Sequence, residues 1–183
     1  MTSQDIELIH IVRKVLKATN SIGITRNKRS EAYRVQIGNV RLYNWFVSIG
    51  LHPNKSRTLG KIDVPEKYFI DFLRGHLDGD GTITSYSDYS NVSKNKDYIY
   101  KRLTVRFLSG SKDHAEWLYE KIVKTTGVIG RLHKVIPNKN YAPMYVIKFG
   151  KKDSLHLLPQ LYHSKKAPCL KRKRDIFEAF IIN

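Results

Sequence analysis

Asp78 and Asp80 lie between glycines at the end of an apolar helical pattern, in the stretch FLRGHLDGDG of residues 72–81. Gly75 and Gly79 are four residues apart, so they share one face of the predicted helix. Small residues at this spacing let two helix backbones approach closely. Asp80 leaves the helix at its end, so two such helices side by side would bring two Asp80 side chains together.

Carboxylates gathered this closely repel one another unless cations neutralise them. Mg²⁺ suits oxygen ligands of this kind and keeps open positions for water and phosphate oxygens. Metal ions roughly 4 Å apart can activate water and stabilise the leaving oxygen of a phosphodiester. The pattern therefore predicts a divalent-metal site beside a phosphate.

Three other interpretations of residues 78–81 are open. The segment could be a plain helix stop followed by a turn. It could be a hairpin turn, although the apolar helical stripe before it argues against this. It could also be a calcium loop, but an EF-hand that begins at Asp78 needs Gly and Glu where the chain has Ile83 and Tyr89, so this interpretation fits poorly.

The chain is strongly basic. Its 183 residues contain 33 Lys plus Arg against 16 Asp plus Glu, which gives a formal net charge of +17 and a pI near 9.9. Such a charge points to a polyanionic partner, first nucleic acid and second an anionic membrane surface. The sequence shows no basic amphipathic helix with a large apolar face, which argues against the membrane as the partner. The length suits one substantial domain or two small ones.

Several features bear on the cellular compartment. No apolar run approaches the roughly 18 residues of a membrane-spanning helix, and residues 1–5 show no secretory signal pattern. The single Cys169 excludes an internal disulfide and a cysteine-rich zinc site. We therefore expect an intracellular protein, cytoplasmic or organellar, with no membrane partner.

Hydrophobic periodicity outlines a mixture of helices and strands. Residues 19–31 are polar and typical of turns, and residues 87–97 are polar. We predict helices at about 6–16, 42–49, 66–78, 112–126, 154–162 and 170–181, and strands at 33–37, 82–86, 101–108, 129–136 and 145–149.

An internal repeat is a second organising pattern. Residues 12–19 resemble residues 119–126, and each stretch is followed by an Ile-Gly pair. Residues 33–38 then resemble residues 145–150. The matching order favours a true repeat, and chance similarity between two amphipathic helices is the alternative.

Each copy continues into an apolar helix and a loop with a lysine, Lys55 in the first copy and Lys165 in the second. We interpret residues 1–62 as a partial repeat (helix, hairpin, helix and basic loop) and residues 63–183 as the complete unit. The first copy lacks the acid-ended helix and the first hairpin. A lysine near a scissile phosphate could stabilise developing negative charge, and ordinary phosphate contact or solvent exposure is the alternative for both lysines.

Alternating polar residues on the predicted strands could contact DNA. On a half-buried sheet, alternate residues share the exposed face. Arg, Gln and Thr can read base edges when a two-stranded ribbon lies in the major groove. A solvated sheet face is the alternative. The candidates are Thr82, Thr84, Tyr86, Arg102, Thr104, Arg106, Arg131, His133 and Lys148 in the complete unit, and Arg34 and Gln36 in the first copy.

The basic run of residues 171–174 could be a nuclear import signal, but a solvated or phosphate-facing side of the last helix fits it better. The seven histidines show no metal-ligand spacing. No Ser/His/Asp grouping and no phosphate-binding Gly loop is evident.

Residues 73–81, LRGHLDGDG, resemble the motif that names the LAGLIDADG homing endonucleases. They keep its first Leu, its Gly, both Asp and the final Gly. The resemblance covers residues 65–182 and, as a partial repeat, residues 3–60. It implies an α+β fold, an αββαββα unit with a saddle-shaped antiparallel sheet over the DNA major groove, preceded here by a truncated copy of the same unit. Paired motif helices would form the interface.

The resemblance also implies roles for single residues. Asp80 would be the metal-binding catalytic acid, and Gly79 would lend its backbone carbonyl to a bound Mg²⁺. Lys165 matches the basic residue near the cleavage site, with Lys55 at the equivalent place in the first copy. Ser111 falls where relatives carry a polar, water-positioning residue. The implied reaction is Mg²⁺-dependent double-strand cleavage of a long DNA site that leaves staggered ends.

Arg74 and His76 replace small or apolar residues of the motif, and only one motif is present. Single-motif relatives work as homodimers and two-motif relatives as monomers. The alternative to a homodimer is a separate chain that supplies the missing motif helix. The alternative function is non-cleaving nucleic-acid binding, as an intron RNA maturase or a DNA-binding regulator. We expect a homodimer joined through residues 68–78, with Phe72, Gly75, His76 and Gly79 at the interface.

Overall fold

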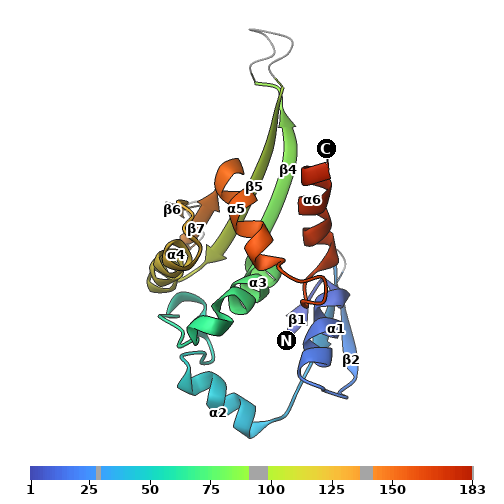
Figure 1. The fold of residues 1–183 in the computed structure, drawn as a ribbon. Helices are drawn as coiled ribbons and strands as arrows, with labels where there is room; N and C mark the ends of the chain where they lie inside the picture. Colours follow the sequence, from blue (N-terminus) through green and yellow to red (C-terminus); the bar gives the residue numbers. More distant parts are fainter. Residues whose placement is uncertain (28–29, 91–98, 137–141, 183) are drawn as a thin grey trace.

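The computed structural model describes residues 1–27, 30–90, 99–136 and 142–182, and within these ranges it contains two antiparallel sheets flanked by helices (Figure 1). The larger sheet has the strand order β4-β5-β7-β6. Its strands are β4 (Thr82–Asp88), β5 (Tyr100–Ser109), β6 (Arg131–Val135) and β7 (Met144–Phe149). Its helices are α3 (Phe69–Asp80), α4 (Lys112–Thr126), α5 (Lys151–Leu161) and α6 (Lys171–Ile182).

The order of elements from α3 to α5 is helix, two strands, helix, two strands and helix, followed by α6. This is the α+β arrangement that the sequence predicts for the complete unit. Strand β4 continues to Asp88, so it includes the start of the polar segment 87–97, of which residues 91–97 lie outside the described ranges. Helix α5 begins at Lys151, three residues earlier than predicted, and it contains Pro159.

Alternation along the strands builds the core of this unit. Val105 of β5 lies opposite Phe149 of β7, and Phe107 lies opposite Ile147, so these side chains share one face of the sheet. All are buried, together with apolar residues of α3, α4 and α5. Helix α5 contacts β5 and α6 contacts β4 (Figure 1). Each fully buried Leu or Phe contributes about 1.5–3 kcal/mol, and the opposite face of the sheet carries the polar residues.

The N-terminal part forms the smaller sheet, with the order β1-β3-β2. The prediction of turns over residues 19–31 is wrong for residues 22–27 and 30–31, because Ile22 pairs with Val35 and Ile24 with Tyr33 in antiparallel strands. The alternating Ile residues and the β-branched Thr25 favour a strand over the polar content of the segment. The elements are β1 (Thr2–Ser3), α1 (Ile6–Val15), β2 (Ile22–Asn27), β3 (Ser30–Val35) and α2 (Val40–Ser48).

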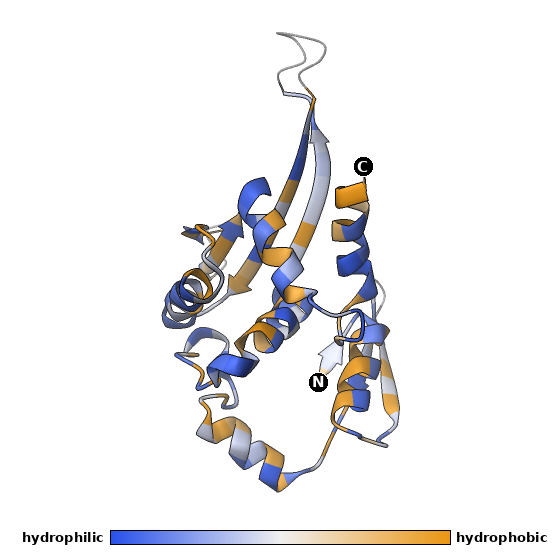
Figure 2. Cartoon of the chain, in the orientation of Figure 1, coloured by the Kyte–Doolittle hydropathy of each residue, from blue (hydrophilic) through white to orange (hydrophobic). Residues whose placement is uncertain are grey.

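Helix α2 is poorly covered. It is amphipathic, with its hydrophobic residues visible in Figure 2, yet none of its residues is buried. Val40 is 75% exposed and Trp45 is 54% exposed. By contrast, α5 buries Leu157, Leu158 and Leu161 against the core of the larger sheet. An apolar helix face of this size is available for contact with a further element.

Helix α3 follows a short 3₁₀ turn at Glu66–Tyr68, and it ends at Asp80 instead of at residue 78. Asp80 is therefore the last helical residue. The Gly81 N–H donates to the Leu77 carbonyl at 3.0 Å. A Cβ at Gly81 would lie 2.6 Å from Leu77 Cδ1 and 2.8 Å from the Leu77 Cα and carbonyl oxygen. Only glycine fits this turn, which sends the chain directly from the acid into β4.

Within the described ranges, no helix combines the length and the apolar composition that crossing a bilayer requires.

Candidate functional site

Helix α3 has one buried and one open face. Leu73 and Leu77 point into the core, whereas Gly75 and Gly79 are exposed. A Cβ built on either glycine would meet nothing within 4 Å. The glycine face is therefore free to receive another helix at close range. Helix pairing across this face stays a prediction.

Asp80 is exposed at the end of this open face. Across the described ranges, no hydrogen bond or ion pair takes up its carboxylate, although its charge partly opposes the lowering of the pKa values of the nearby His76 and Lys173, which burial chiefly causes. An unpartnered carboxylate and a backbone carbonyl are the oxygen donors that Mg²⁺ prefers. The described residues contain no group of three or more His, Cys, Asp or Glu that could hold a metal ion. Among the described residues, Asp80 is the exposed acid at the open end of α3.

The two carboxylates of the motif have different environments. Asp78 is 3% exposed, and its Oδ2 accepts a hydrogen bond from the Leu170 N–H at 2.9 Å. Its Oδ1 is buried and has no hydrogen-bond partner among the described residues, and burial raises the pKa of Asp78. Arg74 is also buried, and it donates to the carbonyls of Pro168 and Leu161. Arg74 therefore does not obstruct the glycine face, and Asp80 alone of the two acids is available to solvent.

His76 turns toward α4. Its ring stacks on His114 with the planes 9° apart, and the two Nε2 atoms are 3.3 Å apart. His114 Nδ1 lies 3.0 Å from the Gly60 carbonyl, which can only accept, so we assign that proton to His114 Nδ1. His76 then donates from Nε2, and its Nδ1 is a buried acceptor for which the described part of the chain provides no donor. Burial, and then the proximity of His114, lower the pKa of His76 to about 4.

Phe72, the other bulky residue predicted at the interface, packs against Trp117 with ring centroids 6.0 Å apart. It is partly buried within the chain. The surface of α3 that stays open for close approach is therefore centred on Gly75 and Gly79.

A row of polar residues crosses the open face of the larger sheet. Thr82 lies opposite Arg106, Arg106 opposite Lys148, and Lys148 opposite Arg131. All four are exposed. Directly opposite residues in antiparallel strands project from the same face. Because Thr82 follows Asp80 by two residues, the acid lies at one end of a row with three cationic side chains.

Thr84, Tyr86, Arg102 and His133 are exposed as predicted, but Thr104 is not. It is 7% exposed, because its short side chain lies between two arginines on the central strand β5. Arg102 forms an ion pair with Asp88 at 2.9 Å. Hydrogen bonds from Ser90 and then from Arg102 lower the pKa of Asp88 to about 2. The charge of Arg102 is therefore partly neutralised by a neighbouring carboxylate.

Arg34 and Gln36, the candidates in the first copy, are both exposed. Arg34 lies on β3 opposite Thr2 and Gly23. Gln36 follows β3, because that strand ends at Val35 and not at residue 37 as predicted. Both candidates belong to the N-terminal part and not to the row on the larger sheet.

The two candidate lysines lie in loops. Lys55 is partly buried in a 3₁₀ turn, and the adjacent Ser56 carbonyl approaches Gly110 so closely that a Cβ there would clash. Lys165 is exposed between α5 and α6, where it lines a groove of about 490 Å³ with Lys14 and Val15 of α1. No described hydrogen bond or ion pair joins either lysine to Asp80.

Ser111, the predicted water-positioning residue, makes an anchoring contact within the chain. It is 2% exposed, and its hydroxyl donates to the Leu59 carbonyl at 2.5 Å. Together with the contact between His114 and Gly60, this bond fixes the basic loop of the first copy against α4. Its hydroxyl proton is thus already used within the chain.

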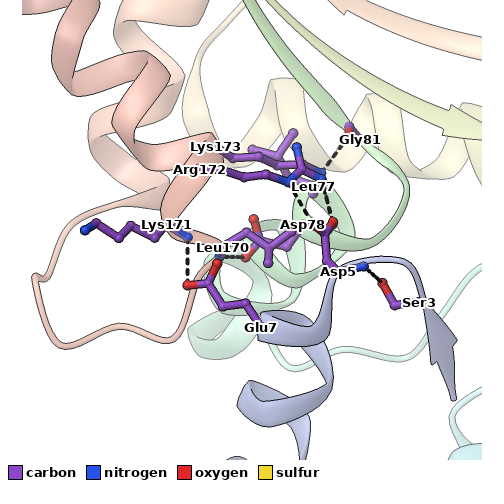
Figure 3. A network of polar contacts seen from close by, with 10 residues as sticks. All are labelled: Ser3, Asp5, Glu7, Leu77, Asp78, Gly81, Leu170, Lys171, Arg172 and Lys173. Atoms are coloured by element: carbon purple, nitrogen blue, oxygen red, sulfur yellow. Dashed lines mark hydrogen bonds and ion pairs between the residues drawn. The ribbon is translucent and has the colours of Figure 1, made fainter. Parts of the chain in front are cut away.

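Sequence reasoning missed Lys173. The residue is 3% exposed, and its ammonium group donates to three backbone carbonyls at the end of α3 (Figure 3). The run 171–174 suggested a solvated or phosphate-facing side of the helix, which is wrong for this residue. A signal was present, since Lys173 precedes Phe177 by one helical turn and so shares its buried face.

Comparisons with family models and with curated protein sequences find no match. Solved structures do match. The meganuclease I-SmaMI bound to uncleavable DNA with a TTCT central four is 14% identical with a TM-score of 0.62, over 100% of this chain and 78% of that chain. The I-SmaMI LAGLIDADG homing endonuclease bound to cleaved DNA gives a TM-score of 0.59, also at 14% identity, over 100% of this chain and 77% of that chain.

The homing endonuclease I-CvuI, in complex with the I-CreI target, is 15% identical with a TM-score of 0.44, over 64% of this chain. The chain spans 66% of I-CvuI and 65% of I-Vdi141I, so it matches about two thirds of these proteins. The I-SmaMI matches establish the fold: this chain has the fold of the LAGLIDADG homing endonucleases.

Proposed function

We propose that the protein is a site-specific DNA endonuclease that makes a Mg²⁺-dependent, staggered double-strand cut in a long recognition site. One observation carries the proposal. The open end of α3 presents an unpartnered Asp80 two residues before Thr82, where a row of basic side chains begins on an exposed sheet face. The fold and the net charge of +17 support it.

The basic row has the dimensions of a DNA groove. Neighbouring strands are about 4.8 Å apart, so the row from Thr82 through Arg106 and Lys148 to Arg131 spans about 14 Å. The major groove is about 12 Å wide. Long Arg and Lys side chains on such a face reach base edges and the phosphates at both rims. Arg106 and Lys148 lie at the centre of the row and are therefore the strongest candidates for base contacts.

Asp80 and the carbonyl of Gly79 would hold the divalent cation. A bound Mg²⁺ activates water and stabilises the leaving oxygen of a phosphodiester. Asp80 would orient the cation at the edge of the sheet, beside the phosphates that the basic row would bind. Lys165 and Lys55 would add positive charge near the scissile phosphates.

The number of acids at the proposed cation site indicates which partner the chain needs. One chain brings one Asp80 and one open glycine face, so a second helix must complete the site. We propose a homodimer joined through residues 68–78. A second candidate is a separate chain that supplies a motif-type helix. The exposed face of α2 favours it, because α5, which would be the counterpart of α2 in the predicted repeat, is covered by the motif helix α3.

Non-cleaving nucleic-acid binding is the second candidate function, as a maturase for intron RNA or a DNA-binding regulator. The motivating observation is the smaller sheet: β1 is only two residues long, and neither of the described N-terminal helices, α1 and α2, ends in an acid. The described part of the chain therefore has a basic surface and one acid-ended helix, α3.

Replacing Asp80 separates the two functions. Duplexes that bind the wild-type protein are selected from a randomised pool, and cleavage is followed in Mg²⁺. We expect Asp80→Asn to reduce cleavage at least 100-fold with DNA affinity within about threefold of wild type. Asp113→Asn, an exposed acid on α4, is the matched control and keeps full activity. Equal cleavage by Asp80→Asn refutes the assignment of the acid, whereas binding without cleavage by wild type in every metal supports the second function.

A further inference from the structure

A buried lysine from another helix forms hydrogen bonds with the end of α3. Lys173 of α6 donates from Nζ to the carbonyls of Leu77 at 2.5 Å, Asp78 at 2.9 Å and Gly81 at 2.7 Å (Figure 3). An ammonium group has three protons, so every one is used. These carbonyls lie on both sides of Asp80, and neither the Gly79 carbonyl nor the Asp80 carboxylate is among the acceptors.

The contact between the two helices is reciprocal. Lys173 places a positive charge on the C-terminal carbonyls of α3, where a cation is favoured by the helix dipole. Asp78 of α3 in turn accepts from the Leu170 N–H at the start of α6, where an anion is favoured. Burial lowers the pKa of Lys173, and Asp78 opposes this by raising it. Each helix therefore neutralises the other's terminal charge.

The N-terminal segment reinforces this contact. Arg172 forms an ion pair with Asp5 at 2.6 Å, and the Lys171 N–H donates to the Glu7 carboxylate at 3.1 Å (Figure 3). Both acids belong to the start of α1. The first turn of α6 is thus fixed from one side by the first copy and from the other by α3.

A buried ammonium group is costly to desolvate, by several kcal/mol in real proteins even after relaxation. An apolar residue would fill the same place next to Phe177 at lower cost. A lysine adds hydrogen bonds to three converging carbonyls, and the backbone segment that carries these carbonyls also carries residues 79 and 80. A displacement of about 1 Å of a reacting group can reduce catalysis 100-fold.

We propose that Lys173 is a positioning residue that fixes the end of α3 so that Asp80 and the Gly79 carbonyl converge on one divalent cation. This inference rests on the proposed function and assigns a further residue to it. Lys173 does not touch the cation or the DNA. It acts through the backbone that carries both ligands.

The test measures metal binding separately from DNA binding. Mn²⁺ affinity is measured by electron paramagnetic resonance on the complex of the protein with its selected duplex, and duplex affinity is measured without metal. Lys173→Met removes the ammonium group and keeps the chain length. We expect Mn²⁺ to bind at least tenfold more weakly, with duplex affinity changed less than threefold. Lys171→Met, an exposed neighbour with the same loss of charge, should bind Mn²⁺ as wild type does.

The outcomes are distinct. If folded Lys173→Met binds Mn²⁺ like wild type, the positioning role is refuted and the proposed function stands. If wild type itself binds no Mn²⁺, the proposed function fails and this inference fails with it. An equal loss in Lys171→Met also overturns the inference, because net charge would then be the cause.

Two further measurements keep the inference testable if Lys173→Met does not fold. Lys173→Gln removes the charge and retains an N–H donor, so it should weaken Mn²⁺ binding less than Lys173→Met. In wild type, the ¹⁵N resonance of the fully hydrogen-bonded Lys173 ammonium group should shift when Mg²⁺ is added to the duplex complex. A Lys173 ¹⁵N chemical shift that stays unchanged when Mg²⁺ is added would contradict the positioning role.

Discussion

Acidification is expected to destabilise the protein through the stacked histidines of α3 and α4. In the folded chain, His76 is neutral, because burial and the proximity of His114 lower its pKa from 6.5 to about 4. Lys173 contributes a smaller part of this lowering, and Asp80 opposes it. Burial also lowers the pKa of His114. A proton on either ring would place a buried positive charge against the other imidazole.

The magnitude follows from linkage between folding and protonation. Because the pKa of His76 is lower in the folded chain than in the unfolded one, the unfolded chain binds more protons below pH 6.5. The stabilising contribution is complete above pH 6.5 and is lost as the pH falls toward 4. For a pKa of 6.5 unfolded and about 4 folded, the loss between pH 8 and pH 5 is about 2 kcal/mol, and the full loss at lower pH is about 3 kcal/mol.

Urea unfolding at pH 8 and pH 5 measures this loss, with circular dichroism to follow the helices. The control is His76→Leu, which keeps an apolar contact with Phe107 and removes the titrating group. We expect wild type to lose about 2 kcal/mol more than His76→Leu over this interval. Most carboxyl groups titrate below pH 5, so they affect both proteins alike. Equal pH dependence in the two proteins would refute the assignment of the buried pair.

Three further predictions concern α3 and the basic row. Gly75→Ala should raise the free energy of unfolding by about 0.5–1 kcal/mol, since Ala favours helix and its Cβ meets open space, while it weakens self-association in sedimentation experiments. Gly81→Ala should lower the free energy of unfolding by more than about 2 kcal/mol, because its Cβ would clash with Leu77; unchanged thermal melting would contradict the close approach of Gly81 to Leu77. Arg106→Ala, which removes a candidate base contact, should weaken binding to the selected duplex by about 1–3 kcal/mol and relax its sequence preference in binding titrations against duplex variants, whereas Thr104→Val, at a buried position, should leave both unchanged.

Local patterns predicted much of the complete unit. Apolar periodicity located α3, α4 and α6, because a helix that covers a sheet must repeat its apolar residues every three to four positions. Alternation in β5 predicted that Arg102 and Arg106 face away from Val105 and Phe107, since strand geometry sends successive side chains to opposite faces. The excess of positive charge predicted a polyanionic partner, because the net charge follows from the sequence without any tertiary structure.

Local patterns were less informative in the N-terminal part. A hairpin was predicted in residues 1–62, but its strand β2 was not located at residues 22–27, where the sequence IGITRN contains a glycine and ends in two polar residues. Such a short strand depends on pairing with its neighbour as much as on its own composition. The correspondence between the first copy and the complete unit stays a prediction.

The sequence by itself determined that two acids end a glycine-containing helix in a strongly basic chain. Tertiary structure alone decided which acid is available: Asp78 is buried against Leu170, and Asp80 faces solvent. It also decided that Lys173 is a buried contact of α3, whereas its neighbour Lys171 is exposed. The physical reason is separation along the chain. Two residues of the same type, two positions apart, have different environments because their contacts come from segments about ninety positions away. The local sequence pattern does not specify these long-range contacts.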